Sequence, residues 1–125
     1  MQHSTDNPTK EEAARMDRIR EYGCICCIEC GYGRRGRVEV HHIVEGGRRL
    51  GHLYTLPLCP GHHQGRFTAH QRSVIRPDRL VSISRGGKAF VQAFDTERVL
   101  WEILQAALGL PANWPESKIL PRRLA

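Results

Sequence analysis

The segment VEVHHIVEGG, residues 38–47, ends a strand-like run with two adjacent histidines and then reaches a pair of glycines. Alternating apolar and polar residues are typical of a half-buried strand, and paired glycines favour a turn. GRRLGH, TLPLC and PGHHQG follow within residues 47–65. We therefore expect a strand ending in His-His, a basic loop, a second short strand ending in cysteine, and a helix starting with His-His. Such a hairpin and helix can hold one divalent ion between them.

Helical signals lie on both sides of this segment. TKEE, residues 9–12, is a capping box that predicts a helix over residues 10–22. TERVLWEILQAALG, residues 96–109, carries a broad apolar stripe and a terminal glycine. It predicts a second helix, for which Asp95 or Thr96 is the expected cap.

The intervening segments give weaker signals. HHQGRFTAHQR, residues 62–72, can begin a helix, although Gly65 weakens it. LVSIS, residues 80–84, predicts a short strand, and KAFVQAF, residues 88–94, predicts one or two helical turns.

The length of 125 residues predicts one domain. We expect it over residues 10–109, between a flexible N-terminus, residues 1–9, and an extended basic tail, residues 110–125. A chain of this size builds a small core, which a structural metal would stabilise. No stretch approaches the ~18 apolar residues of a membrane helix, and the polar N-terminus differs from a signal peptide. We therefore expect a cytoplasmic protein with no membrane partner.

Positive charge is concentrated in the middle of the chain. Residues 34–88 contain eleven Arg or Lys against three acidic residues, although the net charge of the whole chain is only +6. Most of the basic residues are Arg, whose planar guanidinium suits phosphate oxygens. By itself this pattern favours a nucleic-acid partner and a merely solvated basic surface about equally.

Four of the five cysteines lie in CICCIEC, and the fifth, Cys59, precedes two histidines. Such clustering in a reducing compartment indicates metal binding and not disulfides. Cys24-x-x-Cys27 together with Cys59-x-x-His62 predicts a tetrahedral Cys3His zinc site. The equal spacing of Cys27-x-x-Cys30 leaves the choice of the first pair open. A zinc ion with four protein ligands stabilises the fold and has no open position for catalysis.

The central segments resemble the HNH (ββα-metal) endonucleases. More narrowly, GCICC, GYG, VEVHHI, GGRRLGH, YTLPLCPGHHQG and KAFVQAFDTE are similar to the phage recombination-enhancement (Ref-type) nucleases, roughly over residues 20–108. The resemblance implies an α+β fold, a small zinc-stabilised ββα-metal finger with flanking N- and C-terminal helices. It also implies a metal-dependent endodeoxyribonuclease, phage or prophage encoded and linked to recombination. Such an enzyme would cut DNA engaged by a RecA-type recombinase filament in the host cytoplasm.

The resemblance implies roles for individual residues. His41 and His63 become ligands of a catalytic divalent metal (Mg, Mn or Zn), and His42 becomes the general base. The structural zinc is assigned to Cys24, Cys27, Cys59 and His62. Because GCxxC matches the first cysteine pair, Cys26 and Cys30 become spectators.

Two positions depart from the family pattern. The middle Asn of the motif is missing, and His52 stands nearest its place, where it would orient the base. Ser84 occupies a position at which relatives carry another histidine, and His70 is the candidate replacement for that ligand. A geometric difficulty also arises, because His41 and His42 point to opposite faces of a regular strand. Both can serve one phosphate only where the strand twists or ends.

These residue types suit phosphodiester hydrolysis. A histidine with a pKa near 6.5 is a suitable base at neutral pH, and positioned proton transfer contributes ~10²–10⁴-fold. A divalent ion with few protein ligands keeps positions open for substrate oxygens. Candidate nucleic-acid contacts are Arg34, Arg35, Arg48, Arg49 and Arg66. The alternative is a non-catalytic zinc-knuckle protein that binds nucleic acid, which Ser84 favours.

Overall fold

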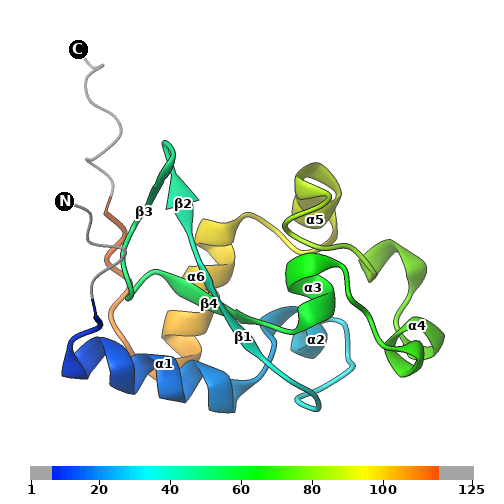
Figure 1. Cartoon of the computed structure of the whole chain (residues 1–125), viewed down its shortest axis with the longest axis horizontal. Helices are drawn as coiled ribbons and strands as arrows, with labels where there is room; N and C mark the ends of the chain where they lie inside the picture. The colour runs from blue at the N-terminus through cyan, green and yellow to red at the C-terminus, as the bar shows by residue number, and fades with distance from the viewer. Residues whose placement is uncertain (1–6, 116–125) are drawn as a thin grey trace.

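The predicted hairpin and helix lie at the centre of the computed structural model, which describes residues 7–115. Strands β1 (Glu39–His42) and β4 (Thr55–Leu58) pair antiparallel. Helix α3 (Pro60–Gln64) starts directly after β4 and contacts both strands (Figure 1). The α+β class is therefore confirmed, with short two-stranded sheets and flanking helices.

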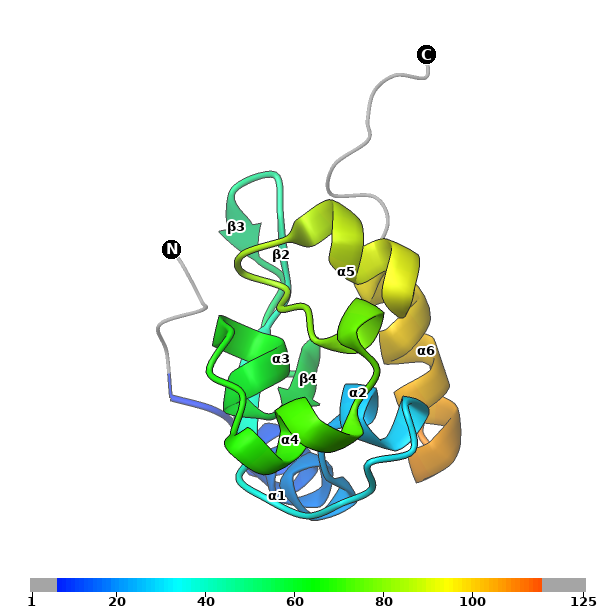
Figure 2. The same ribbon diagram turned by 90° about the vertical axis from the view of Figure 1, so that its right-hand side faces the viewer.

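The connection between these strands is more regular than the predicted basic loop. It contains a second antiparallel pair, β2 (Val44–Glu45) and β3 (Arg48–Arg49), which forms a separate sheet. Gly46 and Gly47 form the tight turn with φ of 61° and 78°, a region that favours glycine. This small hairpin projects from the body of the protein in both Figure 1 and Figure 2.

Three further helices pack against β4, whose four residues are all buried. They are α1 (Lys10–Tyr22), α2 (Ile25–Glu29) and α6 (Glu97–Leu108). The core combines β4 with the inner faces of these helices, through Ile19, Ile25, Leu56, Leu58, Leu100, Trp101 and Leu104. Burial of these apolar side chains fixes the hairpin in position.

The two long helices have the caps that the sequence predicts. The Thr9 hydroxyl accepts the backbone N–H of Glu12, and the Glu12 carboxylate accepts the backbone N–H of Thr9. Thr96, and not Asp95, caps α6, because its hydroxyl accepts the backbone N–H of Val99. No helix within residues 7–115 is long and apolar enough to cross a bilayer.

The predicted helix over residues 62–72 is divided in two. α3 ends at Gly65, whose φ of 87° lies in the left-handed region, and α4 (Ala69–Val74) starts with a new capping box. The knuckle CICCIEC likewise contains the short helix α2. The helical turns predicted near residue 90 are confirmed as α5 (Gly87–Ala93).

The short strand predicted for residues 80–84 is wrong. After the 3-10 helix η2 (Pro77–Arg79), this segment runs into a turn and pairs with no strand. The backbone N–H groups of Ile83 and Ser84 donate instead to the carbonyls of His62 and His63. These carbonyls lie at the end of α3, where a short helix leaves its acceptors unsatisfied. Docking onto α3 therefore replaces sheet pairing.

The start of the predicted tail packs on the domain. Pro111 accepts a hydrogen bond from the side chain of Gln105, and the Trp114 ring lies against Tyr54 and Trp101. The predictions for residues 1–6 and 116–125 lie outside the described residues.

Candidate functional site

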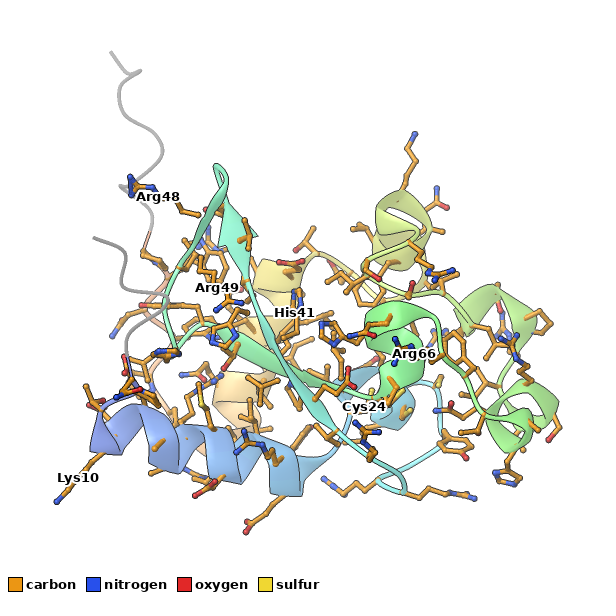
Figure 3. All side chains as sticks on the ribbon, in the orientation of Figure 1. Lys10, Cys24, His41, Arg48, Arg49 and Arg66 are labelled. Atoms are coloured by element: carbon orange, nitrogen blue, oxygen red, sulfur yellow. The ribbon has the colours of Figure 1, made fainter. Side chains whose placement is uncertain are left out.

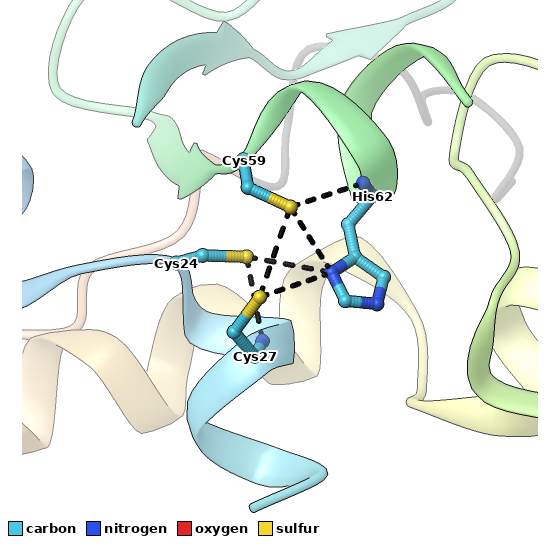
Figure 4. Close-up of side chains that lie close together, drawn as sticks. All are labelled: Cys24, Cys27, Cys59 and His62. Carbon is cyan, nitrogen blue, oxygen red and sulfur yellow. Dashed lines mark hydrogen bonds between the residues drawn. The ribbon is translucent and has the colours of Figure 1, made fainter. Parts of the chain in front are cut away.

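Four buried side chains from two helical N-termini form one cluster, the Cys3His cluster of Cys24, Cys27, Cys59 and His62 (Figure 4). Cys24 is the N-cap of α2, and Cys59 is the N-cap of α3. Each of the two sulfurs accepts the backbone N–H of the residue three positions later, which is the next ligand. The C-x-x-C and C-x-x-H spacings thus run from the cap to the third position of a helix.

The distances in the Cys3His cluster fit a tetrahedral zinc ion. Zinc bonds of about 2.3 Å to sulfur and about 2.1 Å to nitrogen place tetrahedral ligands roughly 3.4–3.8 Å apart. The Nδ1 atom of His62 lies 3.6 Å from the sulfurs of Cys24 and Cys27 and 3.4 Å from that of Cys59. The sulfurs of Cys27 and Cys59 are 3.7 Å apart. The cluster could therefore hold a structural zinc.

Outer contacts fix these ligands. The Gln71 amide donates to the sulfurs of Cys27 and Cys59 at 3.6 and 3.4 Å. The Nε2 atom of His62 lies 3.0 Å from the Arg79 carbonyl, so an Nε2–H donates there and Nδ1 keeps its lone pair for a metal. With all four ligands buried, the site is closed to substrate.

Two thiols of the cluster, those of Cys24 and Cys27, differ in pKa without a cation. Hydrogen bonds with Cys24 and Cys59, together with burial, raise the pKa of Cys27. Burial opposes ionisation of Cys24, but hydrogen bonds from the neighbouring thiols and His62 hold its pKa below the ordinary value. A metal that binds thiolates removes this competition and releases protons.

The remaining cysteines lie outside the cluster. Cys26 is buried in the core, where burial raises the pKa of its thiol. Cys30 is partly exposed, and its sulfur lies 3.7 Å from the Cys27 carbonyl. The spacing Cys24-x-x-Cys27, and not Cys27-x-x-Cys30, therefore contributes to the Cys3His cluster.

The second group of side chains, the histidine site, consists of His41, His42, His52 and His63. The Nδ1 atom of His41 on β1 lies 3.3 Å from the Nε2 atom of His63 on α3. Two ligands of one ion with bonds of about 2.1 Å lie roughly 3.0–3.4 Å apart in octahedral or tetrahedral geometry. The two rings meet edge to face, and their side chains are 17% and 20% exposed. They can therefore share one ion that solvent still reaches.

A carboxylate lies behind each of these two rings. The Nδ1 atom of His63 is 2.8 Å from Oε1 of Glu39, and the Nε2 atom of His41 is 3.4 Å from Oε2 of Glu97. If each carboxylate accepts the N–H of its ring, neither of the facing nitrogens carries a hydrogen. Two lone pairs at that distance repel unless a cation lies between them.

His42 belongs to a separate pair within the same site. Its Nε2 atom lies 3.1 Å from Nδ1 of His52, a buried residue of the loop before β4. Burial, and then the positive charge of Arg49, lower the pKa of His42 to about 4. The ring is therefore neutral at pH 7 and has a lone pair that can accept a proton, but the lowered pKa also makes it a weaker base than an ordinary histidine. His41 and His42 contact different partners, as alternation along β1 requires.

His70 does not join the histidine site. It is exposed on α4, and its Nδ1 atom lies 2.8 Å from the hydroxyl of Tyr32. Within the part of the chain that the structure describes, the Cys3His cluster is the only group of three or more potential ligands with atoms within 4.8 Å. Ser84 does lie beside the site, since its backbone N–H donates to the carbonyl of His63.

The five predicted arginine contacts fall into two groups. Arg34 and Arg35 stack over Tyr22 and Tyr32 at 5.0 and 4.5 Å, and each donates to the carbonyl of the same tyrosine. These two side chains therefore help to hold the loop after α2. Arg48, Arg49 and Arg66 are exposed (Figure 3). Among them, Arg49 is close enough to His42 to affect its pKa.

Three residues of these sites were not predicted from the sequence. Glu39 had a usable signal, because it stands two residues before His41 on the same face of a strand. Gln71 lies in a capping box with Thr68, which gives no hint of its sulfur contacts. Glu97 had no local signal, since it lies 56 positions from His41.

A comparison with protein-family models identifies the family of the chain. The family described as "Recombination enhancement, RecA-dependent nuclease" matches residues 8–108, which include every residue of both sites. A search of curated proteins finds no match.

Proposed function

We propose, from the premise that the chain belongs to the RecA-dependent nucleases of recombination enhancement, that it is a metal-dependent DNA endonuclease of the HNH type. The observation that carries this proposal is the 3.3 Å approach of the His41 and His63 nitrogens, with the neutral His42 next in the chain. A metal position and a base thus lie on one strand end.

His41 and His63 would hold the divalent ion. When bound, Mg²⁺, Mn²⁺ or Zn²⁺ supplies positive charge to the scissile phosphate and to the leaving oxygen. Two imidazoles leave several coordination positions for substrate and water. Neutral rings also leave the charge of the ion undiminished, unlike carboxylate ligands.

His42 would act as general base. The tautomer with hydrogen on Nε2 donates to Nδ1 of His52, and Nδ1 of His42 then accepts a proton from the attacking water. His52 is a positioning residue in this arrangement, in the place of the asparagine of the usual motif.

Arg49 would bind the phosphate next to the scissile one, with Arg48 further out on the same hairpin. Both lie on the exposed strand β3, and the charge of Arg49 acts on His42. A guanidinium in that position suits phosphate oxygens. Arg66, next to α3, extends the same contact, and DNA held by a RecA-type filament is the proposed substrate.

The test is cleavage of circular plasmid DNA with Mg²⁺ or Mn²⁺, with and without a RecA-type filament on the DNA. We expect the wild type to cut and His42→Ala to lose about 10²–10⁴-fold in rate, because it lacks the base. DNA affinity and melting temperature should change little. His70→Ala is the matched control, because it removes a histidine that contacts Tyr32 outside the site.

Absence of cutting by wild-type protein under all of these conditions would reject the nuclease. It would favour the alternative function, a non-catalytic zinc-knuckle protein that binds nucleic acid. Ser84 is the observation that favours this alternative, because a position beside His63 carries no imidazole.

A further inference from the structure

The two histidines proposed as metal ligands have acidic partners from different parts of the fold. Glu39 precedes His41 on β1 and contacts His63, whereas Glu97 opens α6 and contacts His41. We propose that Glu39 and Glu97 are positioning residues that prepare these rings to bind a divalent cation. This proposal rests on the proposed metal position, and it adds the C-terminal helix to the site.

In this structure, neither Glu39 nor Glu97 is placed to bind the proposed divalent ion directly. Each carboxylate contacts the ring nitrogen that faces away from the other histidine. Within residues 7–115, no third ligand atom joins those of His41 and His63 within 4.8 Å. The acids therefore act through the rings and not on the ion.

The effect of such a carboxylate is to select the tautomer. Accepting the N–H of Nδ1 on His63 leaves the lone pair on Nε2, and accepting the N–H of Nε2 on His41 leaves it on Nδ1. These are the two atoms that face each other. A negative partner also raises the basicity of the imidazole, which strengthens its bond to a metal.

The two contacts differ in strength. The His63 contact is short, at 2.8 Å, and the carboxylate of Glu39 is 21% exposed. The His41 contact is longer, at 3.4 Å, and Glu97 is 30% exposed. Glu39 should therefore contribute more to metal affinity than Glu97.

The turn before α6 holds Glu97 in place through an unusual backbone. Asp95 has a φ of 141°, a value that residues with a Cβ rarely adopt, and its carboxylate accepts the backbone N–H of Thr96. Thr96 then caps α6, so that Glu97 is the first helical residue. A strained backbone at Asp95, two residues before Glu97, supports a role for this turn in positioning the Glu97 side chain.

Each acid also has an ordinary structural explanation. Glu97 would be favourable at the N-terminus of any helix, and Glu39 also lies 3.5 Å from Arg37. Both explanations predict a loss of stability on substitution, and neither predicts a loss of metal affinity or a change of imidazole tautomer. Those two properties therefore decide between the explanations.

The experiment is titration of the zinc-loaded protein with Mn²⁺ by calorimetry, without DNA. We expect one exchangeable Mn²⁺ site, and about 10–100-fold weaker binding in Glu39→Ala and Glu97→Ala. Glu39→Gln and Glu97→Gln should lose less, because an amide oxygen still accepts the ring N–H. Glu102→Ala is the matched control, since Glu102 lies on the same helix and pairs with Arg98 on the surface.

A second readout is the ¹⁵N NMR spectrum of the histidine rings. The wild type should show His41 with hydrogen on Nε2 and His63 with hydrogen on Nδ1, and each alanine variant should lose the preference of its own partner ring. Wild-type Mn²⁺ affinity in both alanine variants, or no exchangeable Mn²⁺ in the wild type, overturns the positioning role. Plasmid cleavage is scored separately, so Mn²⁺ binding that depends on Glu97 without DNA cutting would reject the nuclease and retain the positioning role.

Discussion

The Cys3His cluster and the histidine site both take a side chain from the short helix α3, but they differ in how completely the protein surrounds them. The cluster has four ligands, all buried, whereas the histidine site brings two imidazoles together at partial exposure. A closed tetrahedral site leaves no place for substrate, but a two-ligand site does. This difference is the one expected between a structural zinc site and the proposed catalytic site.

Adjacent residues of α3 serve the two sites. His62 joins the Cys3His cluster, and His63 contacts His41 and Glu39. Successive residues of a helix point about 100° apart, since the helix has 3.6 residues per turn. The Cys3His cluster therefore fixes the direction of the helix that carries a proposed ligand of the second site.

Loss of the Cys3His cluster should have the largest effect on the protein. We expect Cys59→Ser to abolish cooperative unfolding, because a serine hydroxyl can still cap α3 but cannot supply the thiolate that a structural zinc requires. Structural zinc contributes on the order of 10 kcal/mol in small domains, comparable to the whole stability of a domain this size. Thermal denaturation by circular dichroism, with zinc content measured in parallel, tests this.

Cys30→Ser is the control for that experiment, because Cys30 is outside the cluster. It should keep its zinc and most of its melting temperature. His42→Ala should also remain folded, because we expect the Cys3His cluster to stabilise the fold and the histidine site to carry out the chemistry. An equal fall in melting temperature for Cys59→Ser and His42→Ala would contradict that division.

A smaller loss of stability is expected from Gly61→Ala within α3. A Cβ at this position would overlap the ring of Phe67, which packs edge-on against His62 at a centroid distance of 5.1 Å. Overpacking of this kind costs about 1–3 kcal/mol, which chemical denaturation measures. Gly87→Ala, at the start of α5 with nothing within 4 Å, is the matched control and should be neutral or stabilising. Equal stability of the two variants would show that the packing of Phe67 against His62 does not stabilise the cluster.

The smallest effect is expected from the titration of His42. Burial first, and then Arg49, lower its pKa to about 4, below the ordinary value of 6.5. The unfolded chain therefore binds a proton that the folded protein excludes, and stability falls as the pH drops from 6.5 toward 4. Because the ring is half-buried and solvent screens its charge, the slope should be less than about 1.36 kcal/mol per pH unit.

Denaturant midpoints at pH 7 and pH 5 measure this slope. The variant His42→Gln removes the titrating group and should lose less stability on acidification than the wild type. An identical loss in both proteins would mean that His42 titrates like an exposed histidine. Its neutral form would then no longer distinguish the histidine site from the rest of the surface.

Much of the fold follows from local signals. The capping box at Thr9 and the apolar stripe of residues 96–109 predicted α1 and α6, because caps and amphipathic faces are properties of neighbouring residues. The segment of residues 80–84 misled for the opposite reason. Its alternation of apolar and polar residues is typical of a strand. Its backbone N–H groups, however, donate to the free carbonyls at the end of α3 and not to a neighbouring strand.

The sequence alone determined the ligands of the Cys3His cluster up to the choice between two cysteine pairs, and it marked the strand end with His41 and His42. Short spacings place ligands through local helix and turn geometry, which needs no knowledge of the rest of the fold. Only the tertiary structure decided that Glu97 reaches His41 and that His70 faces Tyr32 instead. Such contacts join distant segments, and their geometry is set by the packing of α4 and α6 and not by any local pattern.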